Sequence, residues 1–143
     1  MARGFEAVKT LTIDAPPAKV WEALTNPAQV KQYMHGTTLS TDWKVGGPIS
    51  WTGEWNGQAY EDKGEVLEFE ARRRLKNTHW SSMGGSEDIP ENYHTVTYEL
   101  VDLGDKTRLT LTQDNNPSQE AADQMADANW GPILQGLKET AEK

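Results

Sequence analysis

Residues 13–34, IDAPPAKVWEALTNPAQVKQYM, predict two short helices that follow one another directly after a strand. Residues 16–17 are both Pro, which suits a first helical turn because a missing N–H costs little there. Asn26-Pro27 ends the first helix and starts the second, since Asn can cap backbone N–H groups and Pro suits the first helical position. The first helix carries a one-sided apolar stripe at helical spacing: Val20, Trp21 and Leu24.

The strand before these helices is FEAVKTLTI, residues 5–13. We expect a register shift near Lys9-Thr10, because Val8 is out of step with Leu11 and Ile13. Asn56-Gly57 predicts a tight hairpin turn, since both residues tolerate positive φ. Further candidate strands, several with alternating apolar residues, follow the helices at residues 37–43, 48–55, 58–69, 74–81, 93–101 and 107–113.

A long helix should close the chain. Asn116-Pro117-Ser118-Gln119 repeats the earlier start signal, so the helix should begin near Pro117 and run to about Glu142. Gly131-Pro132 should kink it without ending it, because the apolar stripe continues beyond that point. We therefore expect a single α+β domain over residues 1–143, with about seven antiparallel strands curved around the last helix.

The composition excludes several classes of partner. The chain has 143 residues, a formal net charge of −8 and no cysteine, and its mean hydropathy is −0.76. This negative charge argues against nucleic acid and anionic membranes. Without cysteine there is no thiolate chemistry and no disulfide. The first 14 residues lack the apolar run of a signal peptide, so we expect a cytoplasmic protein.

Four stretches carry a resemblance to a known family. They are residues 13–34, GEVLEFEARRRL (64–75), VTYELVDLGDKTRLTLTQ (96–113) and NWGPILQGLKETAE (129–142). In this order they resemble the START/Bet v 1-like superfamily, and within it the AHSA1 family, related to the activator of Hsp90 ATPase. The resemblance implies a helix-grip fold. The superfamily includes lipid and hormone carriers, aromatase/cyclases and antibiotic self-resistance proteins.

The predicted cavity between sheet and helix should be lined by aromatic and apolar side chains. In relatives the strand at residues 74–81 tends to be apolar, so His79 should make this wall more polar, unless a one-residue slip puts Trp80 there. Ordinary core packing is the alternative for each candidate, and Trp43 and Trp55 are expected at the rim or surface. The candidate ligand-binding residues are Trp21, Trp51, His79, Trp80, Tyr98, Met125, Trp130 and Leu134.

No residue pattern specifies catalysis, a metal or a cofactor. His79 and His94 fall on adjacent predicted strands and could lie near each other, but no metal-binding spacing unites them with His35, which we expect in a solvent-facing loop. Phosphate-binding glycine motifs and a nucleophile elbow are absent from the sequence. Five acids crowd one strand and are expected on its solvated face: Glu61, Asp62, Glu65, Glu68 and Glu70.

Three functions remain open from the sequence. The first is a carrier or binder of a small apolar or aromatic ligand, such as a lipid, acting as a monomer or weak homodimer. The second is an interaction module that resembles the Hsp90 co-chaperones and acts in stress response, for which an exposed patch of Trp43 and Trp55 would count. The third is a cyclase- or hydrolase-type enzyme that uses His79, His94 or Tyr98.

Overall fold

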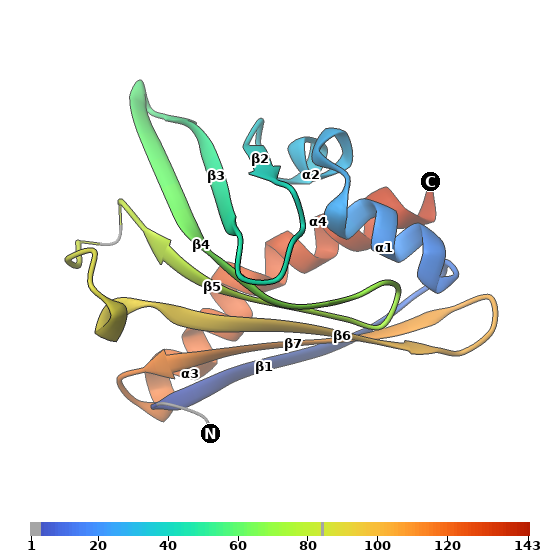
Figure 1. The fold of residues 1–143 in the computed structure, drawn as a ribbon. Coiled ribbons are helices and arrows are strands. Elements are labelled where there is room, and N and C mark those ends of the chain that lie inside the picture. The colour runs from blue at the N-terminus through green and yellow to red at the C-terminus, as the bar shows by residue number, and fades with distance from the viewer. Residues whose placement is uncertain (1–3, 84) are drawn as a thin grey trace.

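The computed structural model describes residues 4–83 and 85–143, except for the side chain of Trp55. One antiparallel sheet runs in the order β1-β7-β6-β5-β4-β3-β2. Two short helices follow β1, and a long C-terminal helix crosses the sheet, so the predicted helix-grip α+β fold is confirmed (Figure 1). The strands are β1 (Phe5–Ile13), β2 (Thr38–Thr41), β3 (Pro48–Trp55), β4 (Gln58–Glu70), β5 (Arg74–Ser81), β6 (His94–Asp102) and β7 (Thr107–Asn116).

The two short helices meet at the Asn26-Pro27 signal that the sequence carries. Asn26 caps α2, since its side chain accepts a hydrogen bond from the backbone N–H of Ala28 at 2.9 Å. The 3₁₀ turn Pro90–Asn92 precedes β6. The helices are α1 (Pro17–Thr25), α2 (Pro27–Tyr33), α3 (Gln119–Gln124), a π-helical segment (Met125–Trp130) and α4 (Gly131–Glu142). None of the described helices is long and apolar enough to cross a membrane.

The sheet bends between its two halves, where β4 meets β5. In Figure 1 strands β2 to β4 rise steeply away from the other four strands. The register of β4 against β5 shifts between Val66 and Glu68, as at a β-bulge. Gly64 lies near this point, and a Cβ there would be 1.8 Å from the carbonyl oxygen of Thr78. Only glycine therefore allows the two backbones to approach closely enough for this bend.

Two buried clusters fill the space inside the curve. The larger cluster joins α1 and α4 to β5, β6 and β7, with Leu109, Leu111 and Leu134 nearly inaccessible to solvent. The smaller cluster consists of Val30, Leu39, Ile49 and Val66. Three partly buried aromatic residues pack against both clusters: Tyr33, Trp43 and Phe69.

The structure corrects the predicted register of β1. The shift lies between Phe5 and Ala7, not near Lys9-Thr10. From Ala7 onward the strand alternates regularly, with Ala7 and Ile13 buried and Val8 54% exposed. Val8 was out of step with Leu11 because it lies on the solvent face of the sheet, where an isolated apolar side chain is ordinary.

The C-terminal helix starts later than predicted, and β7 ends later. Ser118 is the N-cap, and its side chain accepts from the N–H of Ala121 at 3.0 Å. Asn116 remains in β7, where its side-chain amide donates to the carbonyl of Phe5 at 2.9 Å. Beyond this start the helix continues past Pro132 as predicted. The π-helical segment lies immediately before Pro132, whose missing N–H leaves the carbonyl one turn earlier without its usual donor.

Candidate functional site

A cavity of about 490 Å³ lies between the inner face of the sheet and the C-terminal helix. This volume is within the usual range for a small-molecule site. Most of its wall is apolar or aromatic, and one group of polar residues lies on the adjoining strands β4, β5 and β6. The polar lining residues are Asp62, Asn77, His79, Ser81, Ser86, Asn92, His94, Gln113 and Asn129.

Most of the residues predicted to line the cavity do so. The C-terminal helix supplies Met125, Trp130 and Leu134, and the sheet supplies the others. The sequence analysis missed several wall residues. Some lie on other elements, such as Met34 after α2, and others, such as Asn77 and Ile133, lie on β5 and α4 beside predicted residues. The predicted residues that lie in the lining are Trp51, His79, Trp80, Tyr98, Met125, Trp130 and Leu134.

Trp21 lies outside this lining. Its side chain is 8% exposed and belongs to the larger core cluster. The ring centroid is 5.3 Å from that of Phe69. The apolar stripe of α1 therefore points Trp21 into the packed core between α1 and the sheet, and no part of it faces the cavity.

Trp43, predicted at the rim or the surface, is partly buried and packs against both buried clusters. Its ring stacks on Phe69 with a centroid separation of 5.2 Å, and it lines the cavity. The backbone of Trp43 has φ of 60°, a left-handed conformation that is uncommon for a bulky residue. This conformation turns the ring inward, which the sequence does not signal. The prediction for Trp55 concerns a side chain outside the described residues.

Trp130 and Tyr98 form the part of the wall where the helix faces the sheet. Their rings meet edge to face with centroids 6.1 Å apart. The indole N–H of Trp130 donates to Oε1 of Gln113 at 3.1 Å, which fixes the ring orientation. Burial raises the pKa of Tyr98 well above its usual value, so its hydroxyl keeps its proton.

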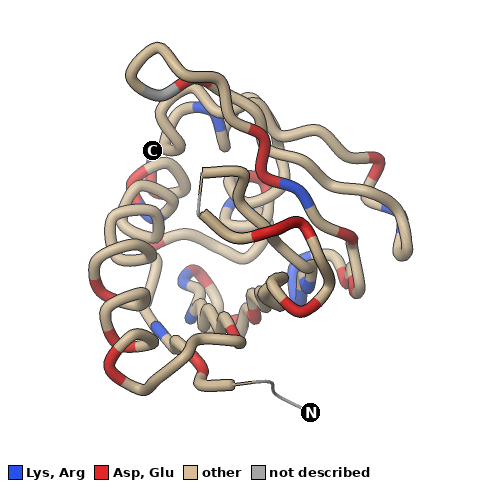
Figure 2. Tube along the Cα trace, turned by 90° about the vertical axis from the view of Figure 1, so that its left-hand side faces the viewer, with Lys and Arg blue, Asp and Glu red and all other residues tan. Residues whose placement is uncertain are grey.

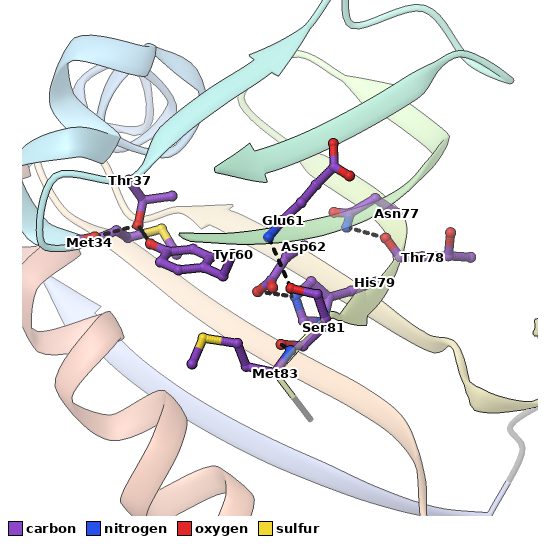
Figure 3. Close-up of polar contacts among 11 residues, drawn as sticks. Met34, Thr37, Tyr60, Glu61, Asp62, Asn77, Thr78, His79, Ser81 and Met83 are labelled. Carbon is purple, nitrogen blue, oxygen red and sulfur yellow. Dashed lines mark hydrogen bonds and ion pairs between the residues drawn. The ribbon is translucent and has the colours of Figure 1, made fainter. Parts of the chain in front are cut away.

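A carboxylate and an imidazole form the polar side of the cavity. The Nε2 atom of His79 lies 3.1 Å from Oδ2 of Asp62 (Figure 3). The two side chains are only 26% and 23% exposed. The ring of Trp51 meets the imidazole edge to face at 5.3 Å between centroids. The Oδ1 atom of Asp62 and the Nδ1 atom of His79 are buried and have no hydrogen-bond partner among the described residues.

His79 and His94 are directly opposed on β5 and β6, so the expectation that they lie near each other is confirmed. Both line the cavity. The Nδ1 atom of His94 is 2.7 Å from the carbonyl oxygen of Asp114. A carbonyl can only accept, so Nδ1 carries the proton of the neutral ring and Nε2 retains a lone pair. His35 is exposed in the segment after α2, as expected.

The register resolves the alternative between His79 and Trp80. His79 shares its face of β5 with buried Asn77, whereas Trp80 lies on the other face. There the Trp80 ring stacks on Tyr93 at 6.4 Å and lies 5.7 Å from the ammonium of Lys63. Trp80 contributes to the edge of the cavity, and His79 faces its interior.

Asp62 was wrongly predicted to face solvent. Along β4 it shares its face with Gly64 and buried Val66, and two-residue alternation brings it inward. Glu61 and Glu65, one position away, are exposed as predicted. The bulge after Val66 reverses the alternation for the later acids. The sequence did contain a signal for this orientation: Asp62 lies an even number of positions from Val66, so the two side chains share a face. We missed it because four other acids on the strand suggested a solvated face.

The polar side of the cavity holds one paired carboxylate and imidazole. A His–Asp pair can move a proton, but no Ser, Thr or Lys is hydrogen-bonded to either side chain among the described residues. In the same part of the chain, no group of three His, Asp or Glu side chains converges as metal ligands would. The cavity therefore offers apolar surface together with a few fixed polar atoms.

The comparisons with known proteins agree with this architecture. Residues 14–142 match the family model described as activator of Hsp90 ATPase homolog 1-like protein. The solution structure of ChR145 from Cytophaga hutchinsonii is 47% identical, with a TM-score of 0.83 over 97% of this chain and 94% of that one. No curated protein sequence matches the chain.

More distant structures share the fold. Protein MLL2253 of Mesorhizobium loti is 24% identical with a TM-score of 0.74, over 95% of this chain and 96% of that one. An HSP90 activator from Plasmodium falciparum is 22% identical with a TM-score of 0.72, over 95% of each chain. Since the family match extends over almost all of the helix-grip fold described above, this chain belongs to the AHSA1 family of the START/Bet v 1-like superfamily.

Proposed function

We propose that this protein binds a small apolar or aromatic molecule in the cavity between the curved sheet and the C-terminal helix. The observation that carries the proposal is the cavity itself, about 490 Å³ in volume and walled by Trp51, Tyr98, Trp130 and Leu134. Burial of apolar ligand surface would supply most of the affinity, at roughly 25 cal/mol per Å² before the costs of association.

An interaction module like the Hsp90 activators is the alternative that the family match supports. That function would be favoured by an exposed aromatic patch. Trp43, one of the two residues whose exposure would count for such a patch, is partly buried and stacks on Phe69. The structure therefore gives more support to a ligand in the cavity than to a partner on this surface.

The test is calorimetric titration of butylbenzene into the purified protein and into two Phe variants of α4. Ile133 lines the cavity and is partly buried, whereas Gln135 on the same helix is exposed and outside the lining. Ile133→Phe should narrow the cavity and weaken binding by about tenfold or more, because an overfilled site costs roughly 1–3 kcal/mol. The Gln135→Phe variant should bind butylbenzene with the same affinity as the parent protein. Absence of saturable binding to the parent, or equal weakening in both variants, would contradict the proposal.

A further inference from the structure

We propose that the polar side of the cavity accepts hydrogen bonds from its occupant, which makes this a site for an alcohol or phenol and not for a carboxylate. The inference rests on the proposed function and specifies the chemical class of the ligand. It depends on Asp62, His79 and His94, which lie on β4, β5 and β6 and all line the cavity.

The first acceptor is Nδ1 of His79. The Nε2 atom of this ring is 3.1 Å from a carboxylate oxygen of Asp62, and a carboxylate only accepts. The proton of the neutral imidazole is therefore on Nε2, and Nδ1 carries a lone pair. Nδ1 is buried with no partner among the described residues. A buried acceptor without a partner is costly, and a ligand hydroxyl would remove this cost.

The second and third acceptors come from the neighbouring strands. Asp62 donates nothing, and its Oδ1 atom is also buried without a partner among the described residues. On β6, His94 uses its Nδ1 proton for the carbonyl of Asp114 at 2.7 Å, so its Nε2 is an acceptor as well. His79 and His94 are register partners, which brings the two rings to adjacent positions on the cavity wall.

The cationic groups that would hold a carboxylate are missing from this wall. Among the described residues that line the cavity there is no Lys or Arg. The nearby ammonium of Lys63 is paired with Asp88 at 2.5 Å and lies over Trp80, on the other face of the sheet. The indole N–H of Trp80 is buried and has no partner in the part of the chain that the structure describes, but alternation along β5 turns it away from His79.

A ligand carboxylate would therefore face Asp62 and two imidazole lone pairs without a compensating charge. The ligand carboxylate would lose its hydration and be repelled by the Asp62 carboxylate. Both effects make its binding free energy less favourable. A ligand hydroxyl would instead be stabilised here, since it can donate a hydrogen bond to Nδ1 of His79 or Oδ1 of Asp62. Hydrogen bonds to charged acceptors are the stronger kind.

The experiment compares three matched probes by calorimetry at about pH 8.5, where an imidazole is ordinarily neutral. The probes are 4-butylphenol, butylbenzene and 4-butylbenzoate. We expect 4-butylphenol to bind about tenfold tighter than butylbenzene, as one good hydrogen bond to a buried acceptor would give, and 4-butylbenzoate to bind most weakly.

Variants assign the preference to the named atoms. His79→Phe should remove most of the phenol advantage while butylbenzene still binds. Asp62→Asn should improve 4-butylbenzoate binding by about tenfold, because it removes the facing charge and adds an amide donor. Glu61→Gln is its matched control: it makes the same charge change one residue away on the exposed face of β4, and it should leave all three affinities unchanged.

The two proposals fail in different ways. If butylbenzene does not bind to the folded parent protein, the proposed function is wrong. If butylbenzene binds but 4-butylphenol gains nothing over it, or if 4-butylbenzoate binds tighter than the phenol, the cavity binds ligands and this inference about their class is overturned. A phenol advantage that persists in both His79→Phe and Asp62→Asn would also overturn it.

Discussion

At the scale of single residues, the hydroxyl of Tyr98 links the stability of the protein to alkaline pH. Burial raises the pKa of Tyr98, and burial raises the pKa of Tyr33 as well, whose hydroxyl donates to the carbonyl of Ala23 at 2.8 Å. The folded protein therefore keeps these protons at a pH where the unfolded chain loses them. The contribution of these two tyrosines to the unfolding free energy is fully present below about pH 10, the ordinary pKa of Tyr in the unfolded chain. It falls as the pH rises above that value.

Tyr98→Phe should weaken this dependence. Between about pH 8 and 11 the parent should lose about 1.4 kcal/mol more unfolding free energy than the variant, because only the parent must keep Tyr98 protonated. Urea unfolding of both proteins across this range measures the difference. Lysine titration contributes equally to both proteins, and burial, the main cause of the raised pKa of Tyr33, is the same in both. A constant difference at all pH values would therefore show that Tyr98 is not responsible.

Single residues also mark the limit of what the sequence could predict about the site. Trp51, Tyr98 and Trp130 could be assigned to the wall from strand alternation and helical spacing. Trp43 could not, because its inward direction depends on a left-handed backbone conformation between β2 and β3. The inward direction of Asp62 could be predicted only from its even spacing to Val66. The later acids of β4 gave no guide, because the alternation of the strand reverses at the bulge after Val66.

At the scale of elements, the closest approach of two helices depends on a glycine. A Cβ added at Gly136 of α4 would lie 2.7 Å from the Cβ of Tyr33 at the end of α2. Carbon atoms pack at about 3.5–4.0 Å, so a methyl group would force the helices apart. The Cβ of Tyr33 is next to the backbone and cannot move aside by a change of rotamer.

Gly136→Ala should therefore destabilise the protein by about 1–3 kcal/mol, even though Ala is the better helix former by roughly 1 kcal/mol. Gly131→Ala is the matched control in the same helix. A Cβ there would meet its nearest neighbour at 3.9 Å, an ordinary contact. The control should therefore be destabilised less than Gly136→Ala, with only the restriction that Pro132 places on a preceding residue that has a Cβ. Thermal unfolding distinguishes them, and equal effects in both variants would show that the contact with Tyr33 carries no cost.

The elements themselves were largely predictable because their signals are local. The order of strands and helices, the Asn56-Gly57 turn and the Asn26 cap all follow from neighbouring residues. The start of the last helix was misplaced because Asn116 has a long-range partner. Its amide reaches the carbonyl of Phe5, 111 positions earlier, and no local pattern reports that contact.

At the scale of the whole molecule, the excess of negative charge is carried on the outside. The chain has 22 Asp and Glu against 14 Lys and Arg. Figure 2 shows acidic positions along the outer side of the C-terminal helix and on the loops. Inside, Asp62 is the one carboxylate among the described residues that line the cavity. The hydrophilic composition and the aromatic cavity are therefore compatible, because the two kinds of residue lie on different sides of the same elements.

Phe69 is one of three aromatic residues that pack against both buried clusters, and its ring contacts aromatic residues in two other segments of the chain. Its ring contacts Trp21 at 5.3 Å and Trp43 at 5.2 Å, and it packs against both buried clusters. Without the Phe69 ring, the smaller cluster, together with β2 and β3, would lose part of its packing contacts with the larger cluster. Such weakly attached parts open before the rest of a domain.

Phe69→Ala should lower the unfolding free energy by about 3 kcal/mol, the lower end for a buried Phe since this ring is only partly buried. Its more specific effect should be seen by native-state hydrogen exchange. Amide protection in Thr38–Thr41 and Pro48–Trp55 should fall more than in β6 and β7, because the smaller cluster then opens on its own.

The control is Leu103→Ala, at a turn where the side chain is 42% exposed, and it should change stability by less than about 0.5 kcal/mol. A uniform loss of protection in Phe69→Ala would mean that the two halves open as one unit.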